Sequence, residues 1–193
     1  MITVEAAGET DTAEIARVYV ETWRTAYAGI LSDAALTGMS ERRSAEEWGW
    51  VIRQRRDVQP VIVARELDQV LGMVSVGLSR RRDRPSGGRF EPSTLALPVG
   101  EVFTLYVAPE AQERGIGRRL LAAGFEALAK RSCARVFLWV LRDNPSRFFY
   151  ERMGGRAIAE RTELLWGRSV PELAYGWDDC VAAGRRLAAC SVR

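Results

Sequence analysis

The segment Gln112–Gly117, with the sequence QERGIG, separates an apolar run, Val102 to Val107, from an amphipathic stretch, Gly115 to Lys130. Apolar residues on both faces of the first run predict a central, buried strand, and the helical spacing of the second predicts a helix. Two glycines at the junction permit a tight turn and a close backbone approach to a ligand. Because a helix begins there with unpaired N–H groups, we expect it to bind a phosphate or pyrophosphate.

The rest of the chain alternates strands and helices around this junction. Val136 to Leu141 is a second continuously apolar run, so the two runs and the helix between them predict a strand-helix-strand unit with parallel strands. The other expected elements are a strand Ile2 to Ala6, a helix from Thr12 to near Gly29, a helix Glu41 to Arg56, a hairpin of Pro60 to Arg65 and Val70 to Leu78 turning at Asp68-Gln69, a short helix Ser146 to Met153, strands Ala157 to Trp166 and Val170 to Trp177, and a terminal helix Asp178 to Ala189.

These elements predict one mixed α/β domain with a central sheet of six to seven strands flanked by helices. The length of 193 residues is typical of a single domain. We expect residues 1–178 to form it and residues 179–193 to add a helical extension. Residues 80–98 are rich in Arg, Pro and Gly and lack periodicity, which is typical of a functional or disordered connection.

Composition excludes several classes of protein. The longest uncharged stretch, Gln69 to Ser79, is too short to span a bilayer, and the N-terminus has no apolar signal region, so we expect a cytoplasmic protein without membrane contact. A formal charge of +3 does not indicate a nucleic-acid partner. The basic run at residues 80–84 is the only feature that favours one.

The chain has no histidine, which excludes Ser-His-Asp and Cys-His catalysis and histidine metal ligands. Cys133, Cys180 and Cys190 are odd in number and lack the paired spacing of a zinc site or a disulfide framework. We therefore expect reduced cysteines, no metal, and any catalysis to depend on carboxylates, tyrosine or backbone groups.

The glycine segment fits neither common nucleotide motif. A dinucleotide-binding fingerprint would need a third glycine where Leu120 stands, and a P-loop would need Gly-Lys-Ser/Thr. The pattern Gln-x-x-Gly-x-Gly between strand and helix instead resembles the acyl-CoA pyrophosphate loop of GNAT superfamily N-acetyltransferases. A second matching block follows at Asn144, Phe149, Tyr150 and Gly154, and residues 23–31 resemble a Trp/Tyr-Gly pattern of many bacterial members.

This resemblance, which covers about Val99 to Gly155, implies that acetyl-CoA is the acyl donor. The implied cofactor contacts come from the strand, the glycine turn and the second block: Leu105, Tyr106, Val107, Gln112, Glu113, Arg114, Gly115, Ile116, Gly117, Arg118, Asn144 and Phe149. The match departs from the family at Arg147, where many members have a small residue, and at Gly155, where they have Phe.

Acetyl transfer to an amine needs a proton acceptor, because an alkyl ammonium with a pKa of ~10.4 is almost entirely charged at pH 7. The resemblance implies Glu101 as general base and Tyr150 as general acid for the leaving thiolate, in a ternary complex without an acyl-enzyme. Glu101 equally fits a solvated charge at a strand start, and Tyr150 a packed core tyrosine. Cys133 follows a helix end and is interpreted as structural.

We expect the acceptor to be a primary amine on a small molecule or peptide, and the sequence leaves its identity open. Trp23 and Tyr27 are candidates for the acceptor pocket, although aromatic residues at helical spacing are more often core, and the run at residues 80–84 is a candidate flap. Transfer of a longer acyl group and a non-catalytic acyl-CoA sensor are the alternative functions. A homodimer formed through sheet edges or the terminal helix is also possible for this fold.

Overall fold

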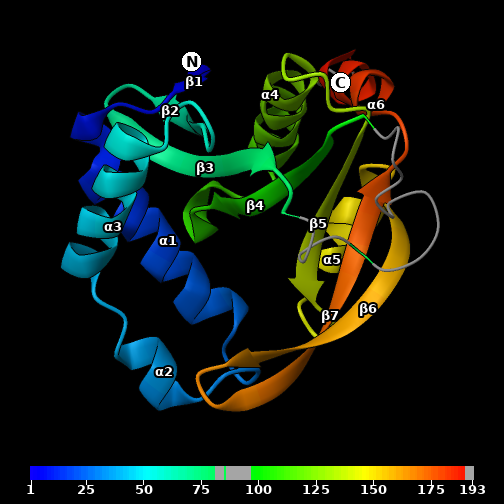
Figure 1. Cartoon of the computed structure of the whole chain (residues 1–193). Helices are drawn as coiled ribbons and strands as arrows, with labels where there is room; N and C mark the ends of the chain where they lie inside the picture. Colours follow the sequence, from blue (N-terminus) through cyan, green and yellow to red (C-terminus); the bar gives the residue numbers. More distant parts are fainter. Residues whose placement is uncertain (81–84, 86–96, 190–193) are drawn as a thin grey trace.

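The computed structural model describes residues 1–80, 85 and 97–189. Its seven strands form one mixed sheet in the order β1-β2-β3-β4-β5-β7-β6 (Figure 1). The strands are β1 (Ile2–Ala6), β2 (Val61–Glu66), β3 (Gln69–Leu78), β4 (Val99–Val107), β5 (Arg135–Leu141), β6 (Arg156–Leu165) and β7 (Arg168–Trp177). The pair β4 and β5 is parallel, and the other neighbours are antiparallel. The predicted mixed α/β sheet is therefore confirmed.

Helices cover both faces of this sheet. They are α1 (Thr12–Ala26), α2 (Asp33–Thr37), α3 (Glu41–Gln54), α4 (Ile116–Ala129), α5 (Arg147–Arg152) and α6 (Cys180–Ala189), with short 3₁₀ turns at Glu9–Asp11 and Pro109–Ala111. One face packs on α4: a Cβ on Gly124 would lie 3.0 Å from Val76, and the ring of Phe125 lies 5.1 Å from that of Trp177. The opposite face is covered by α1 and α3 (Figure 1).

The two central strands stay together for only three residue pairs. Val99 pairs with Arg135, Gly100 with Val136, and Glu101 with Phe137, after which β4 and β5 diverge. Figure 1 shows β4 and β5 running in clearly different directions beyond this point. On its other side β4 continues to pair with β3 as far as Val107, with an irregularity that leaves Phe103 as an extra residue. A wedge therefore opens in the middle of the sheet.

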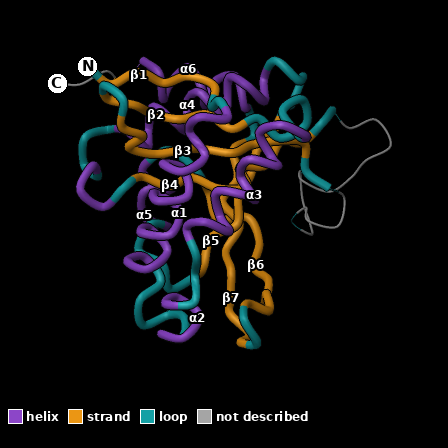
Figure 2. Tube along the Cα trace, turned by 90° about the vertical axis from the view of Figure 1, so that its left-hand side faces the viewer, coloured by secondary structure: helices purple, strands orange, loops and turns teal. Residues whose placement is uncertain are grey.

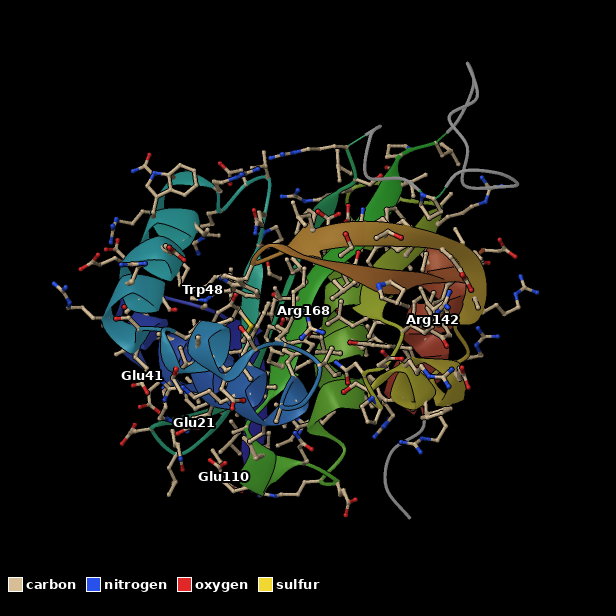
Figure 3. The ribbon with its side chains drawn as sticks, turned by 90° about the horizontal axis from the view of Figure 1, so that it is seen from below. Glu21, Glu41, Trp48, Glu110, Arg142 and Arg168 are labelled. Carbon is tan, nitrogen blue, oxygen red and sulfur yellow. The ribbon has the colours of Figure 1, made fainter. Side chains whose placement is uncertain are left out.

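The long β6–β7 hairpin extends away from the rest of the sheet and ends near α2, as both ribbon views show (Figures 1 and 2). Two contacts hold its tip against the last turn of α1 and the segment that follows. The ring of Trp166 lies edge-on to that of Trp23, with 5.1 Å between the ring centroids. A guanidinium nitrogen of Arg168, which is labelled in Figure 3, donates to the Ile30 carbonyl at 3.2 Å. The hairpin thus supplies one wall beside the wedge.

Most predicted elements are confirmed, with four corrections. The hairpin between β2 and β3 turns at Leu67-Asp68 rather than Asp68-Gln69, because Leu67 adopts a φ of 55°. The first helix ends at Ala26 instead of near Gly29, and α2 was not predicted. The run Val102 to Val107 is central, but from Phe103 onward it is only partly buried because β5 has left it.

Some sequence expectations fall outside the described residues, namely most of the 80–98 connection and Cys190. Cys133 and Cys180 are buried and do not form a disulfide within the described residues. No helix within the described part of the chain is long and apolar enough to cross a membrane. A cluster of His, Cys, Asp or Glu suited to a metal ion is likewise absent from residues 1–80, 85 and 97–189.

Candidate active site

A cavity of about 850 Å³ occupies the wedge between β4 and β5. Both diverging strands line it, together with the last turn of α1, the start of α4, and α5. Of the sixteen positions predicted from the sequence, fourteen line this cavity; the two that do not are Glu101 and Arg114. The structure therefore brings the glycine segment, the second motif block and the N-terminal aromatic pair to one place.

The start of α4 forms one end of the cavity. Gly115 precedes the helix with a φ of 75°, a left-handed conformation that favours glycine, and it provides no side-chain cap. The first N–H groups of α4 are thus left for a ligand. Gly117 is confined differently: a Cβ there would lie 3.3 Å from the Phe149 ring, so the two motif blocks meet at this residue. Gln112 braces the turn by donating to the Val107 carbonyl at 3.2 Å.

Arg114 and Arg118 diverge from each other at this turn. The Arg114 guanidinium pairs with the Glu66 carboxylate at 2.7 Å, which lowers the pKa of Glu66, and Arg114 does not line the cavity. Arg118 does line it, while one of its nitrogens donates to the Leu187 carbonyl on α6. Arg114 therefore contributes to the turn through its backbone.

Along the β4 wall of the cavity, the strand is no longer paired with β5. Leu105, Tyr106 and Val107 are half-buried and line the cavity, and β4 has no register with β5 beyond Glu101. On this side their backbone groups lack the strand that would pair with them in a continuous sheet. The Val107 carbonyl accepts from Thr22 Oγ1 on α1 at 3.3 Å, which holds the helix against the strand.

Three polar side chains meet at the Tyr27 hydroxyl. Burial raises the pKa of Tyr27, and hydrogen bonds with the side chains of Tyr106 and Asn144 oppose that rise. The Asn144 side chain is buried, and its Oδ1 accepts from the Ser146 N–H at 2.9 Å. Asn144 is thereby oriented by its own turn, and the three residues join α1, β4 and the loop after β5.

Tyr150 lies deep in the cavity wall. Its side chain is 8% exposed, and its ring contacts those of Phe149 at 5.2 Å and Tyr175 at 6.3 Å. Burial raises the pKa of Tyr150 far above its usual range, and the neighbouring Tyr27 raises it further. The phenol therefore remains protonated at neutral pH and is available as a hydrogen-bond donor.

Glu101 lies at the point where the wedge begins. It forms the last parallel pair with β5, opposite Phe137, and it also pairs with Gly77 on β3. Its side chain is buried, with 9% exposure, and the cavity lining on β4 starts one residue later at Val102. The structure thus places this carboxylate beside the cavity rather than in its surface.

The sequence analysis missed a second carboxylate, Glu172 on β7, which does line the cavity. Its side chain is 12% exposed and accepts a hydrogen bond from Arg161 Nε on β6 at 2.7 Å. Glu172 interrupts an otherwise apolar run, Val170 to Ala174, and a charge within this predicted strand was the available signal.

Trp23 contributes a polar atom that was not foreseen. Its indole Nε1 is buried and has no hydrogen-bond partner among the described residues. The ring packs against Tyr27 at 4.5 Å and lines the cavity. A ligand with a hydrogen-bond acceptor in this region would satisfy the indole N–H.

Both departures from the family pattern have local causes. A Cβ on Gly155 would lie 2.7 Å from the Trp177 ring, so the space of a larger residue is already filled by β7. Arg147 lies over the Phe148 ring at 4.1 Å and pairs with Glu151 at 3.7 Å, on the outside of α5. Neither change blocks the cavity, since neither residue lines it.

Comparisons with known proteins agree with this geometry. A model of the Acetyltransferase (GNAT) family matches residues 21–155. The chain is 31% identical over 183 residues to the uncharacterized N-acetyltransferase YuaI of Bacillus subtilis (strain 168), covering 94% of this chain and 96% of that protein.

Solved structures share the fold at lower identity. The PaiA N-acetyltransferase of Thermoplasma acidophilum in complex with coenzyme A has a TM-score of 0.63 at 18% identity, covering 92% of this chain and 99% of that chain. YncA of Salmonella typhimurium with its cofactor acetyl-CoA has a TM-score of 0.62 at 20% identity, covering 92% of this chain and 93% of that chain. The chain therefore belongs to the GNAT family of acetyltransferases.

Proposed function

We propose that this acetyltransferase transfers an acetyl group from acetyl-CoA to a primary amine within a ternary complex. The observation that carries the proposal is the continuity of one cavity from the free start of α4, along the unpaired part of β4, to Tyr150. A long donor with a phosphate at one end and a thioester at the other fits such a path. The complexes of PaiA with coenzyme A and of YncA with acetyl-CoA, which share the fold, support this choice of donor.

The residues present fit the donor. The N–H groups of residues 115–118 would bind the pyrophosphate, since a helix N-terminus favours negative charge. The backbone of Leu105 to Val107 would pair with the amide-containing arm where β5 is missing, and Phe149 would pack beside it. Asn144 is buried and fixed by the Ser146 N–H, so its amide would be held ready for a hydrogen bond.

The proposed proton transfers use two groups of this chain. Because Glu101 lies beside the cavity, it takes one proton from the ammonium through water, and the neutral amine attacks the thioester carbonyl. As the C–N bond forms and the C–S bond breaks, Tyr150 protonates the departing sulfur and regains a proton from the acylated nitrogen. Glu101 then releases its proton to solvent, so the net products are the amide, CoA and one proton.

Calorimetric titration with acetyl-CoA, combined with a thiol-release screen over primary amines, tests this function. Gly117→Ala should weaken acetyl-CoA binding, because its Cβ would lie 3.3 Å from the Phe149 ring and disturb the place where the two motif blocks meet. Gly184→Ala on α6 is the matched control, since a Cβ there also meets a side chain, Phe125, at 3.3 Å but lies outside this cavity. A wild-type protein that bound no acetyl-CoA would refute the proposal.

A further inference from the structure

One wall of the cavity adjoins the proposed donor path but contains none of the proposed donor contacts. It is built from α1, from the end of β5 and from the β6–β7 hairpin, and most of its surface is aromatic or apolar. Its lining residues are Trp23, Tyr27, Trp139, Leu141, Leu165 and Glu172. A compact apolar body fits such a wall, and Glu172 is the charged group within it.

Glu172 is distinctive among the carboxylates near the cavity. Only two described lining residues are carboxylates, and the other, Glu113, belongs to the turn before α4. On β7, Glu172 pairs with Leu141 of β5 on one side and with Arg161 of β6 on the other. Only 12% of its side chain is exposed, and the residue belongs to the cavity lining.

The carboxylate is held in place by a fixed partner. Arg161 Nε bonds Glu172 Oε2 at 2.7 Å, while the guanidinium lies over the Trp139 ring at 4.2 Å and also approaches Glu163 at 3.7 Å. The charge of Glu172 also contributes to raising the pKa of Tyr27, which follows α1. Arg161 therefore occupies one carboxylate oxygen of Glu172, and a cation can approach the other from the cavity.

We infer that Glu172 binds the ammonium of the acceptor, and that the acceptor is a primary alkylamine with a compact apolar or aromatic body. The inference rests on the proposed function and names the acceptor class at the same site. In this arrangement Arg161 is a positioning residue for Glu172, and the aromatic rings of Trp23 and Tyr27 enclose the apolar body. An anionic acceptor would meet the carboxylate and be rejected.

The test measures amine binding without turnover, so that its result is separable from that of the proposed function. The protein saturated with CoA is titrated calorimetrically with 2-phenylethylamine and with 2-phenylethanol, which has the same body but no charge. We expect wild type to bind the amine at least about tenfold more tightly than the alcohol. Glu172→Gln should bring this ratio close to one, with CoA affinity within twofold of wild type.

Two further variants separate binding from folding. Glu163→Gln is the matched control: it removes a carboxylate that also approaches Arg161 but does not line the cavity, and it should keep the wild-type ratio. Glu172→Asp keeps the charge and should retain a clear preference for the amine. The inference would be overturned by a wild-type protein that binds the amine and the alcohol equally, by a Glu172→Gln variant that keeps the wild-type preference, or by a Glu163→Gln variant that loses the preference to the same extent. These outcomes would decide the matter even if the variants differed in stability towards urea.

Discussion

At the scale of single residues, Tyr150 makes the sharpest chemical prediction. Tyr150→Phe keeps the ring packed against Phe149 and Tyr175 but removes the proposed donor, so kcat should fall by about 10² or more while acetyl-CoA binding stays within twofold. Because burial raises the pKa of Tyr150, the phenol should not lose its proton below about pH 10. Steady-state kinetics of both proteins from pH 6 to pH 10 check this. A kcat unaffected by the substitution would remove Tyr150 from the mechanism.

Single residues also mark how far the sequence could predict this site. The glycines and Asn144, Phe149 and Tyr150 were found because they belong to a spaced motif whose parts converge in space. Glu172 was missed because one carboxylate in a strand has no motif, and its proximity to the cavity depends on the pairing of β7 with both β5 and β6. The role of Glu101 as base is still a prediction.

At the scale of elements, α5 and β7 meet at Gly155, where the backbone has no room for a side chain. A Cβ would lie 2.7 Å from the Trp177 ring and 3.0 Å from the Tyr150 carbonyl, so Gly155→Ala should cost about 1–3 kcal/mol of unfolding free energy. Urea denaturation measures the loss. Combining it with Trp177→Phe should give less than the sum of the two single losses, because the smaller ring relieves the clash. Strict additivity would show that the clash is relieved elsewhere.

The elements themselves were predicted where periodicity is long and strong. The helix after Gly115 and the strand after Ala134 follow from their apolar patterns, whereas α2, at five residues, is too short to show one. The hairpin turn was assigned one residue too late, because a leucine with a positive φ, such as Leu67, cannot be predicted from the sequence. The apolar residues on both faces of β4 predicted a strand packed against protein on both sides. From Phe103 onward, however, the strand lines the cavity.

At the scale of the whole molecule, the donor would bridge the two parts of the sheet, which are joined by three residue pairs. Binding to the folded state alone contributes about 2.7 kcal/mol when the ligand is at 100 times Kd. For a protein of this size that corresponds to a rise in Tm of about 5 to 11 °C. Thermal unfolding with and without excess acetyl-CoA checks the value, and Gly117→Ala should reduce the shift. A shift retained in that variant would argue against binding at α4.

Alkaline pH should weaken the whole fold through its tyrosines. Burial raises the pKa of Tyr19 to about 12, and it also raises the pKa values of Tyr27, Tyr106 and Tyr150. Since the unfolded chain loses these protons near pH 10 while the folded chain keeps them, stability is intact below pH 10 and falls above it. Each tyrosine contributes about 1.4 kcal/mol per pH unit. Urea titrations at pH 8, 10 and 11 should show the decline, and Tyr19→Phe should make it shallower; an unchanged slope would contradict this account.

The early parting of β4 and β5 has a consequence for solubility. Unpaired backbone N–H and C=O groups of a strand can pair with an extended segment of another chain. Proteins usually have to protect such groups only on the edge strands of a sheet. Here such groups lie in the interior, beside Leu105 to Val107. An acyl donor bound there as proposed would occupy the place of a neighbouring strand, so the molecule that supplies the acyl group would also protect the sheet against β-augmentation and aggregation.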